Sequence, residues 1–352
     1  PPRSTLFPYT TLFRSITLKK GNIRGQESNG MMVSEREMGL SDEHEGIIDL
    51  PTDTPIGKPM AEIFGLNDPV IDIALTPDRA DCAGVRGVAR DLAAAGLGTL
   101  KPLNTAPVKG SFKSPFSVSI QSPEACPLFL GRYIKGVKNG PSPEWLQARL
   151  KAVGLRPISA LVDITNYFSV GLCRPLHVYD ADRLKGNIHV RLSQKGEAFD
   201  ALNDKSYSLN DGACVICDDS GVLGLGGIVG GASTGCENGT VNVFLECAYF
   251  DPYIIAKTGR AYEIISDARY RFERGVDPAF TVEAIELATR LILELCGGEA
   301  SDVVQAGEVP AWQRSYDFDP AYTKKLGGIN IPAARQTEIL SALGFTVKDG
   351  KA

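Results

Sequence analysis

The chain has 352 residues, of which 43% are hydrophobic and 22% charged, and its formal net charge is −5. This composition is typical of a folded globular protein, and the length exceeds what one hydrophobic core normally holds, so we expect two or three domains. The acidic balance argues against a protein that binds nucleic acid over its whole surface, so any RNA contact must be local. No stretch reaches the roughly 20 apolar residues that span a bilayer, and no secretory signal is recognisable, so we predict a cytoplasmic protein without a membrane partner.

Eight cysteines are spread along the chain, and Cys214 and Cys217 form the only close pair in the sequence. A zinc site would need a second pair, or histidines at ligand spacing, and His44, His177 and His189 supply none. We therefore predict free, mostly buried thiols and no metal bound by this chain.

The first forty residues do not follow one continuous pattern. Residues 1–15 show neither helical nor strand periodicity, and we interpret them as a non-native leader. Residues 16–40 predict a strand, a turn and a second strand, followed by a short helix capped by Ser34.

The next segment, residues 41–110, predicts a small α+β module. A strand at 72–75 is followed, after a proline turn, by an amphipathic helix that ends near Gly96. Arg79 and Asp81 lie between the two, and we expect them to form a structural ion pair at the start of the helix.

A segment rich in Pro, Lys and Ser, residues 99–115, is the best candidate for a linker. It precedes two alternating stretches, 116–120 and 128–134, that predict strands. A helix is then expected to begin at Ser142 and to end at Gly154, with three apolar residues buried on one face, namely Leu146, Leu150 and Val153.

Residues 161–180 gather more polar chemistry than packing requires. An apolar start is followed within a few turns by side chains with donors, acceptors and charge, namely Asp163, Thr165, Asn166, Tyr167, Arg174, His177 and Asp180. For each residue alone, a helix cap, a turn or a satisfied interior side chain is an adequate explanation. Together they indicate the wall of a site.

Three further strands are predicted at 188–192, 213–216 and 241–246. Between the last two lies the glycine-rich stretch 221–231, which invites a dinucleotide-binding interpretation. That interpretation fails because Val229 occupies the position of the third glycine and the sequence that follows does not begin a helix. We expect these glycines to let the backbone approach a bound ring.

Residues 251–276 carry five basic side chains beside acidic ones that include Glu263, Asp267 and Glu273. Contact with a phosphate backbone and a solvated mixed-charge surface both fit this pattern, and the two alternatives stay open. A core helix is predicted after Asp277, with an apolar stripe that ends at Gly297. The last segment predicts a strand, two helices at 320–326 and 332–343, and a final strand.

Five strings, in order along the chain, resemble those of one protein family: Ser28–Glu35, Asp163–Tyr167 with Pro175–Asp180, Gly226–Gly231, Leu245–Ala248 and Tyr270–Pro278. On these strings the chain is identified as a member of the bacterial phenylalanine-tRNA ligase (phenylalanyl-tRNA synthetase) beta-subunit family, truncated at both ends. The similarity runs from about Asn22 to Lys348. The sequence departs from the family pattern at Ile265 and Arg269, where His and Ser are usual.

The resemblance implies an α+β, multidomain fold. A central mixed α/β editing module with antiparallel sheets is expected at residues 111–305. The small α+β module at 41–110 precedes it, and residues 16–40 are expected to be the remnant of an oligonucleotide-binding barrel. Residues 306–352 are expected to form a partial winged-helix-like module.

The resemblance also implies a function. In this family the beta subunit pairs with an alpha subunit in a heterotetramer that uses ATP and Mg²⁺ to attach phenylalanine to tRNA(Phe), and the beta subunit hydrolyses tyrosine wrongly attached to that tRNA. Such editing is needed because a pocket shaped for phenylalanine rejects an added hydroxyl by no more than about a hundredfold. For this chain we expect editing and a contribution to tRNA binding, no aminoacylation by the chain alone, and no cofactor of its own.

The resemblance places the expected editing site within the matched strings and in the segment just before Tyr270. The substrate-binding residues would be Glu246, Gly227, Gly226 and Ala268, and the catalytic residues His177, Asn166, Thr165 and Ser266. The Glu246 carboxylate would accept a hydrogen bond from the phenol hydroxyl, and the glycines would leave room for the ring. The opposite wall, with Asn166, Thr165 and His177, would hold the ester and the terminal adenosine. No nucleophile with an adjacent base is visible, so we expect attack by a positioned water.

Two other interpretations stay open. The chain could be a non-catalytic scaffold and tRNA-binding fragment of the subunit, or a free-standing editing-like domain for another amino acid. A deacylation assay on mischarged tRNA separates the first from an editing enzyme, and the side chain that the pocket accepts separates the second.

Overall fold

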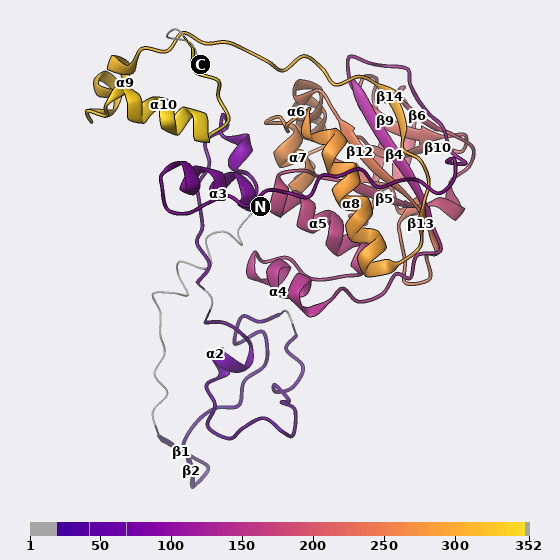
Figure 1. Cartoon of the computed structure of the whole chain (residues 1–352). Helices are drawn as coiled ribbons and strands as arrows, with labels where there is room; N and C mark the ends of the chain where they lie inside the picture. The colour runs from indigo at the N-terminus through magenta and orange to yellow at the C-terminus, as the bar shows by residue number, and fades with distance from the viewer. Residues whose placement is uncertain (1–19, 42, 68, 349–352) are drawn as a thin grey trace. The chain divides into compact units, whose positions relative to one another are not determined.

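A computed structural model describes residues 20–41, 43–67 and 69–348 of the chain (Figure 1). The chain divides into two compact units, Pro1–Pro69 and Val70–Ala352, which are described separately below. The predicted leader, residues 1–15, lies outside the described residues. Within the described ranges, none of the helices has the length and apolar character that crossing a membrane requires.

The described residues of the first unit form a small hairpin and one short helix. Strands β1 (Gly21–Ile23) and β2 (Gln26–Ser28) pair antiparallel, as predicted, and helix α2 spans Met60–Ile63. The helix predicted after Ser34 is wrong. Ser34 and Glu37 do form the reciprocal hydrogen bonds of a helix cap, at 2.8 and 3.3 Å, but the chain makes only a turn. Gly39, with φ +70°, takes the backbone out of the helical region one turn later.

The second unit begins without the strand predicted at 72–75, and that prediction is wrong. The segment pairs with no strand, and its apolar residue Ile73 is 49% exposed. A single 3-10 turn, η2 (Ala80–Cys82), leads instead into helix α3 (Val85–Ala94). The amphipathic helix predicted here is confirmed.

Two five-stranded sheets form the body of this unit. One sheet has the order β11-β10-β9-β6-β3; the other has the order β13-β4-β12-β5, with β14 also paired to β4. Every pairing in them is antiparallel except β3 with β6. The strands are β3 (Val118–Ile120), β4 (Leu128–Lys135), β5 (His177–Asp180), β6 (Ile188–Leu192), β9 (Cys214–Asp218), β10 (Gly221–Leu225), β11 (Val229–Gly230), β12 (Asn242–Tyr249), β13 (Glu299–Ala300) and β14 (Val304–Gly307), with β7 (Ala198–Asp200) and β8 (Ser206–Ser208) as a separate ribbon. The α+β class with antiparallel sheets is therefore confirmed.

The helices that pack against these sheets are α4 (Glu144–Ala152), α5 (Ala160–Leu172), α6 (Pro252–Ala261), α7 (Asp267–Phe272) and α8 (Phe280–Cys296). Helices α9 (Pro320–Gly327) and α10 (Ala333–Ala342) follow in the chain, and α10 packs against α3. The predicted helices in these regions are confirmed, with two corrections in α4. Its cap position is Pro143, since the Ser142 hydroxyl donates to Asp163 instead, and Val153 is 47% exposed. No strand of the predicted kind forms between Gly344 and Lys348, the last described residue.

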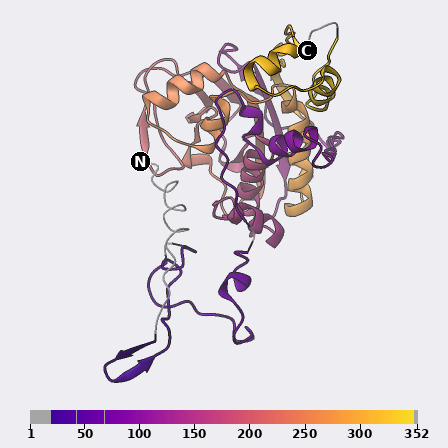
Figure 2. The same ribbon diagram turned by 90° about the vertical axis from the view of Figure 1, so that its left-hand side faces the viewer.

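Strand β12 separates two hydrophobic cores. Its side chains alternate between the two faces of the sheet. Val243, Leu245 and Cys247 join a cluster with α4, α5 and α8, which lie on that face (Figure 1, Figure 2). Phe244 and Ala248 join a second cluster, to which the other sheet and helices α6 and α7 contribute. Glu246 therefore faces the second cluster, between the sheets.

The linker predicted at 99–115 has no regular structure in most of its length, but the body of the unit holds it at several points. The Val108 amide donates to Glu286 on α8 at 2.7 Å, and Arg132 on β4 donates to the Val108 carbonyl. Ser111 N donates to the Ala300 carbonyl at 2.9 Å. This segment is thus a fixed strap and not a free connection.

The close approach of β4 and β12 can be tested at Gly131. A methyl group there would overlap the ring of Phe244, which crosses over the glycine. Gly131→Ala should lower the free energy of unfolding by about 1–3 kcal/mol, the typical effect of overpacking a filled core, as measured by urea denaturation. Gly140→Ala, where nothing lies within 4 Å of the added carbon, is the control. Equal stability of the two variants would contradict this packing.

Candidate functional site

Three polar side chains share one face of the β5–β12 pair. Glu246 on β12 lies directly opposite His177 on β5, and Tyr179 is two residues further along β5. Residues two apart on a strand, and residues directly opposite across an antiparallel pair, point to the same side. Glu246, His177 and Tyr179 therefore all face the space between the two sheets.

A cavity of about 100 Å³ opens at this point. Both sheets and helix α7 contribute to its walls, and the lining is mostly apolar: Pro175, Leu176, His177, Tyr179, Ile216, Gly224, Leu225, Gly227, Ile228, Val229, Gly230, Glu246, Ala268 and Phe272. Its size is of the order of the roughly 150 Å³ apolar cavity that holds one benzene molecule. An apolar cavity with a few convergent polar groups is the usual form of a small-ligand site.

Glu246 lies in this cavity wall with one oxygen engaged. It is 5% exposed, and its Oε2 accepts a hydrogen bond from the Tyr179 hydroxyl at 2.5 Å. Burial raises the pKa of the carboxyl group to about 7, against the lowering effects of the Tyr179 hydroxyl and the Arg174 charge. Oε1 has no hydrogen-bond partner among the residues that the structure describes, so it can accept one from a ligand hydroxyl.

His177 presents an unpaired nitrogen at the same cavity. Its Nε2 is buried and has no hydrogen-bond partner within the described part of the chain. Burial lowers the pKa of the imidazole to about 4, so the ring is neutral at pH 7. Edge-to-face contact with Tyr179, with ring centroids 4.3 Å apart, fixes its orientation. Since buried polar atoms are normally paired, this nitrogen is available to accept a hydrogen bond in the cavity.

The glycines of the β10–β11 hairpin allow close approach to neighbouring rings of the protein. A Cβ on Gly230 would overlap the His177 imidazole, and a Cβ on Gly227 would lie 2.9 Å from Phe250 and 3.0 Å from Phe272. Gly227, with φ +67°, also makes the turn between the two strands. The predicted close approach is thus to His177 and two phenylalanines, although Gly227 does line the cavity.

Gly226 and Ser266 lie next to the cavity without lining it. A Cβ on Gly226 would meet Phe250 at 2.7 Å, so this glycine allows close packing next to the cavity. The Ser266 hydroxyl donates to the Ile228 carbonyl at 2.7 Å and accepts from the Arg269 amide at 3.0 Å as the cap of α7. The first hydrogen bond ties α7 to the hairpin, and the second caps the helix, so Ser266 positions α7. Ala268, two residues on, lines the cavity.

Thr165 and Asn166, expected on the opposite wall, are not among the residues that line this cavity. Both lie on α5, and α5 packs on the face of the sheet that carries Leu245, opposite to the face with Glu246. The Thr165 hydroxyl donates to the Val162 carbonyl of its own helix at 2.8 Å. Sequence spacing placed them near His177, but the sheet lies between α5 and the cavity.

The basic residues at 251–276 are largely engaged within the protein. Arg269 pairs with Glu273 at 2.9 Å, and Arg271, which is 7% exposed, pairs with Asp267 at 2.9 Å. Arg274 also pairs with Glu273 and stacks over the ring of Tyr270, 3.8 Å from its centroid. The sequence left two alternatives for this stretch, contact with a phosphate backbone or a mixed-charge surface. The ion pairs of these three arginines fit the mixed-charge alternative.

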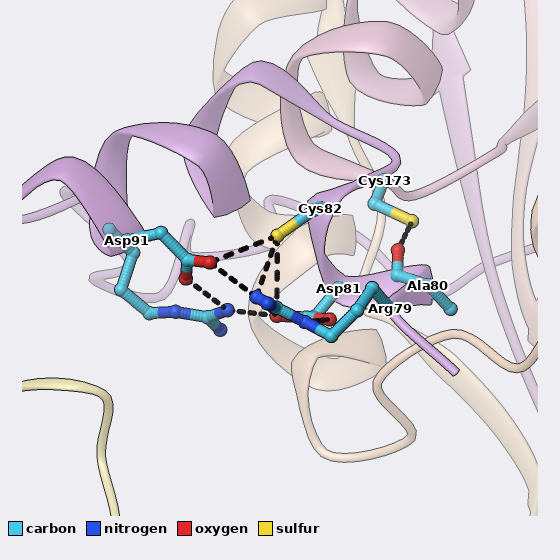
Figure 3. Close-up of polar contacts among 7 residues, drawn as sticks. Arg79, Ala80, Asp81, Cys82, Asp91 and Cys173 are labelled. Atoms are coloured by element: carbon cyan, nitrogen blue, oxygen red, sulfur yellow. Dashed lines mark hydrogen bonds and ion pairs between the residues drawn. The ribbon is translucent and has the colours of Figure 1, made fainter. Parts of the chain in front are cut away.

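A second polar cluster lies at the start of α3 (Figure 3). Arg79 pairs with Asp81 at 3.1 Å and with Asp91, which confirms the predicted ion pair and extends it; Arg90 pairs with both carboxylates. Asp81, Cys82 and Asp91 bring possible metal ligands within 4.8 Å of one another. Because both arginines occupy the carboxylate oxygens, the cluster is an ion-pair network.

Comparison with known proteins identifies the class of this fold and cavity. Residues 125–297 match the family described as the B3/4 domain, and these residues include every cavity-lining side chain. The chain is 58% identical over 336 residues to "Phenylalanine--tRNA ligase beta subunit" of Cereibacter sphaeroides and 55% identical over 336 residues to the protein of the same name from Paramagnetospirillum magneticum. These alignments cover 95% and 94% of this chain and 42% of each relative.

The chain belongs to the phenylalanine-tRNA ligase beta-subunit family. It spans about two fifths of the length of the curated relatives it matches. A solved N-terminal fragment of the phenylalanyl-tRNA synthetase beta subunit from Pyrococcus horikoshii aligns with a TM-score of 0.35 and 16% identity, over 79% of this chain and 78% of that one.

Tyr179 and Phe272 line the cavity but were not predicted as site residues from the sequence. The signal for Tyr179 was available, because alternation along His177-Val178-Tyr179 places the phenol on the same face as the imidazole. Phe272 could not be found in this way, since it reaches the cavity from α7 through the packing of that helix.

The buried carboxyl group makes stability depend on pH. The pKa of Glu246 lies near 7 in the folded chain and at 4.5 ordinarily, so the folded state holds this proton more tightly than the unfolded state. The stability it contributes is present below about pH 4.5 and is lost as the pH rises through 7. At about 1.4 kcal/mol per pKa unit, we expect Glu246→Gln to gain roughly 2–3 kcal/mol relative to wild type between pH 5 and pH 8 in urea unfolding. A constant difference between the two proteins would refute this protonation behaviour.

Proposed function

We propose that this chain carries an editing site that hydrolyses the ester of tyrosine wrongly attached to tRNA(Phe), and that it contributes to tRNA binding. The observation that supports this most directly is the unpaired oxygen of a buried Glu246 in a cavity of the size of one aromatic ring. A tyrosyl side chain would place its hydroxyl at that oxygen, whereas phenylalanine would leave that oxygen without a partner. Sites that hydrogen-bond a substrate hydroxyl discriminate strongly against the analogue that lacks it.

In the proposed reaction a water oxygen bonds to the ester carbon and the bond from that carbon to the ribose oxygen breaks. The water proton finally resides on the released ribose oxygen. The neutral His177 ring can accept a hydrogen bond at Nε2 from the attacking water or from a ribose hydroxyl of the substrate. The apolar walls exclude other water, which strengthens the polar contacts that remain.

For the assembled enzyme we infer the family arrangement, with an alpha subunit and tRNA(Phe) as partners in a cytoplasmic heterotetramer. ATP and Mg²⁺ are assigned to that assembly and to its aminoacylation reaction. The acidic group with the closest ligand atoms among the described residues, Asp81 with Asp91, is already bridged by arginines, which argues against Mg²⁺ at this point.

The role of Glu246 predicts a change in selectivity. Glu246→Ala should reduce the ratio of tyrosyl-tRNA to phenylalanyl-tRNA hydrolysis by about tenfold or more, since a hydrogen bond to a charged acceptor contributes roughly 1.5–3 kcal/mol. Initial rates of deacylation of the two charged tRNAs measure this ratio. Glu299→Ala, at a solvent-exposed carboxylate on β13, is the control and should keep it. An unchanged ratio in Glu246→Ala would remove this residue from hydroxyl recognition.

The role of His177 predicts a loss of turnover without a change in selectivity. We expect His177→Ala to lower kcat for both esters by about tenfold to a hundredfold, within the range for a lost proton-transfer partner. His189→Ala is the matched control, because His189 contacts Ser119 and Asp219 away from the cavity. Full activity of His177→Ala would exclude the imidazole from the reaction, and no hydrolysis by the wild-type chain would favour the scaffold interpretation.

A further inference from the structure

Arg174 is a buried arginine without a carboxylate partner. It lies between α5 and β5 and has no exposed surface, and its Nη2 donates to the Ala248 carbonyl on β12. Nε and Nη1 are buried and find no hydrogen-bond partner within the described residues. An isolated charge in a protein interior is strongly unfavourable, so a nearby compensating group is expected.

The other buried arginines show how unusual this is. Arg132 is 1% exposed and pairs with Glu286 at 2.8 Å, with a further hydrogen bond to the Ser301 carbonyl. Arg271 is 7% exposed and pairs with Asp267. Each of these two charges meets a carboxylate directly, as buried charges normally do. Arg174 differs from both.

Glu246 is the candidate for the compensating charge. Arg174 donates a hydrogen bond to the carbonyl of Ala248, which lies two residues after Glu246 on β12. The guanidinium therefore contacts β12 close to Glu246. The guanidinium also lies 5.9 Å from the ring centroid of Phe272, which lines the cavity. Its charge lowers the pKa of Glu246, opposing the larger effect of burial.

The remaining titratable groups around Glu246 carry no charge near neutral pH. Burial lowers the pKa of His177 to about 4, and it raises the pKa of each of the other neighbours, namely Tyr179, Cys126, Cys214 and Cys247. All five are neutral between about pH 5 and pH 8. An arginine side chain stays protonated throughout that range. Arg174 is thus the charged neighbour that acts on Glu246 there.

We propose that Arg174 is a specificity-determining positioning residue, whose buried guanidinium keeps Glu246 in the carboxylate form that recognises the substrate hydroxyl. This inference rests on the proposed editing function. An ionised carboxylate is an acceptor at both oxygens, so Oε2 can hold the Tyr179 hydroxyl while Oε1 accepts from the substrate. A protonated Glu246 would lose one of these acceptor positions to its own proton.

The first test follows selectivity against pH. The ratio of kcat/KM for tyrosyl-tRNA to that for phenylalanyl-tRNA is measured between about pH 5.5 and pH 9.5 for wild type, Arg174→Gln and Arg174→Lys. Gln can still donate to the Ala248 carbonyl but has no charge, so the midpoint of the profile should rise by roughly one to two pH units, the shift that a neighbouring charge produces. Near pH 7.5 the ratio should fall by about tenfold. Lys, which keeps the charge, should restore the wild-type midpoint.

The matched control is Arg132→Gln, which removes a buried arginine from the opposite face of the same sheet. It should reduce stability and leave the midpoint in place. If Arg174→Gln lowers hydrolysis of both esters equally at every pH, with an unmoved midpoint, Arg174 has only a structural role and the proposal is overturned.

A second measurement needs neither hydrolysis nor a folded Arg174 variant. The ¹³C resonance of the Glu246 carboxyl group, assigned by its loss in Glu246→Gln, is titrated in the wild-type chain. The proposal requires this group to be ionised by about pH 7.5; a carboxyl group that stays protonated to pH 9 overturns it. If the wild-type chain hydrolyses neither ester, the editing function fails, and this titration still decides whether Glu246 is held as a carboxylate.

Discussion

The pairing of β12 with β5 determines what this protein can do. It sets Glu246 opposite His177, brings the Tyr179 hydroxyl to 2.5 Å from the carboxylate, and turns all three toward the second sheet. A slip of one residue in this register would put Glu246 and the two β5 side chains on opposite faces of the sheet. The register is fixed because β12 is buried on both faces, with Val243 and Leu245 on one side and Phe244 on the other.

The surroundings of the cavity act on the protonation of its polar groups in two opposing ways. Its apolar walls keep His177 neutral and raise the pKa of Glu246 toward 7, while one hydrogen bond and one distant charge limit that rise. Burial alone would leave a protonated acid, and a direct ion pair would occupy the oxygen that a ligand needs. Glu246 lies between these two extremes: the Tyr179 hydroxyl binds one carboxylate oxygen, and the other oxygen stays open to a ligand.

Much of the fold could be predicted from local patterns. The helices at α3, α4, α8, α9 and α10 have regular apolar spacing, and the principal strands alternate or form short apolar runs. Glu246, His177, Gly227 and Ala268 were predicted together, and the cavity brings them together. The failures have physical causes. The segment 72–75 has no partner strand, and the turn capped by Ser34 does not continue as a helix because Gly39 leaves the helical region. Thr165 and Asn166 are close to His177 in sequence, but which side of a sheet a helix covers is decided by packing that no local pattern records.

Strand β4 has consequences for how the chain must be made. Its partners are β12, β13 and β14, all encoded far downstream, and the strap that passes Val108 is held by residues on α8 and β13. During synthesis, the apolar run Leu128-Phe129-Leu130 therefore leaves the ribosome long before Asn242 begins the strand that will cover it. Non-local pairing of this kind is slow and leaves unpaired strand edges open to aggregation. The central sheet is completed only when the nascent chain has passed Gly307, so a ribosome stalled before that point would display an apolar strand that chaperones bind.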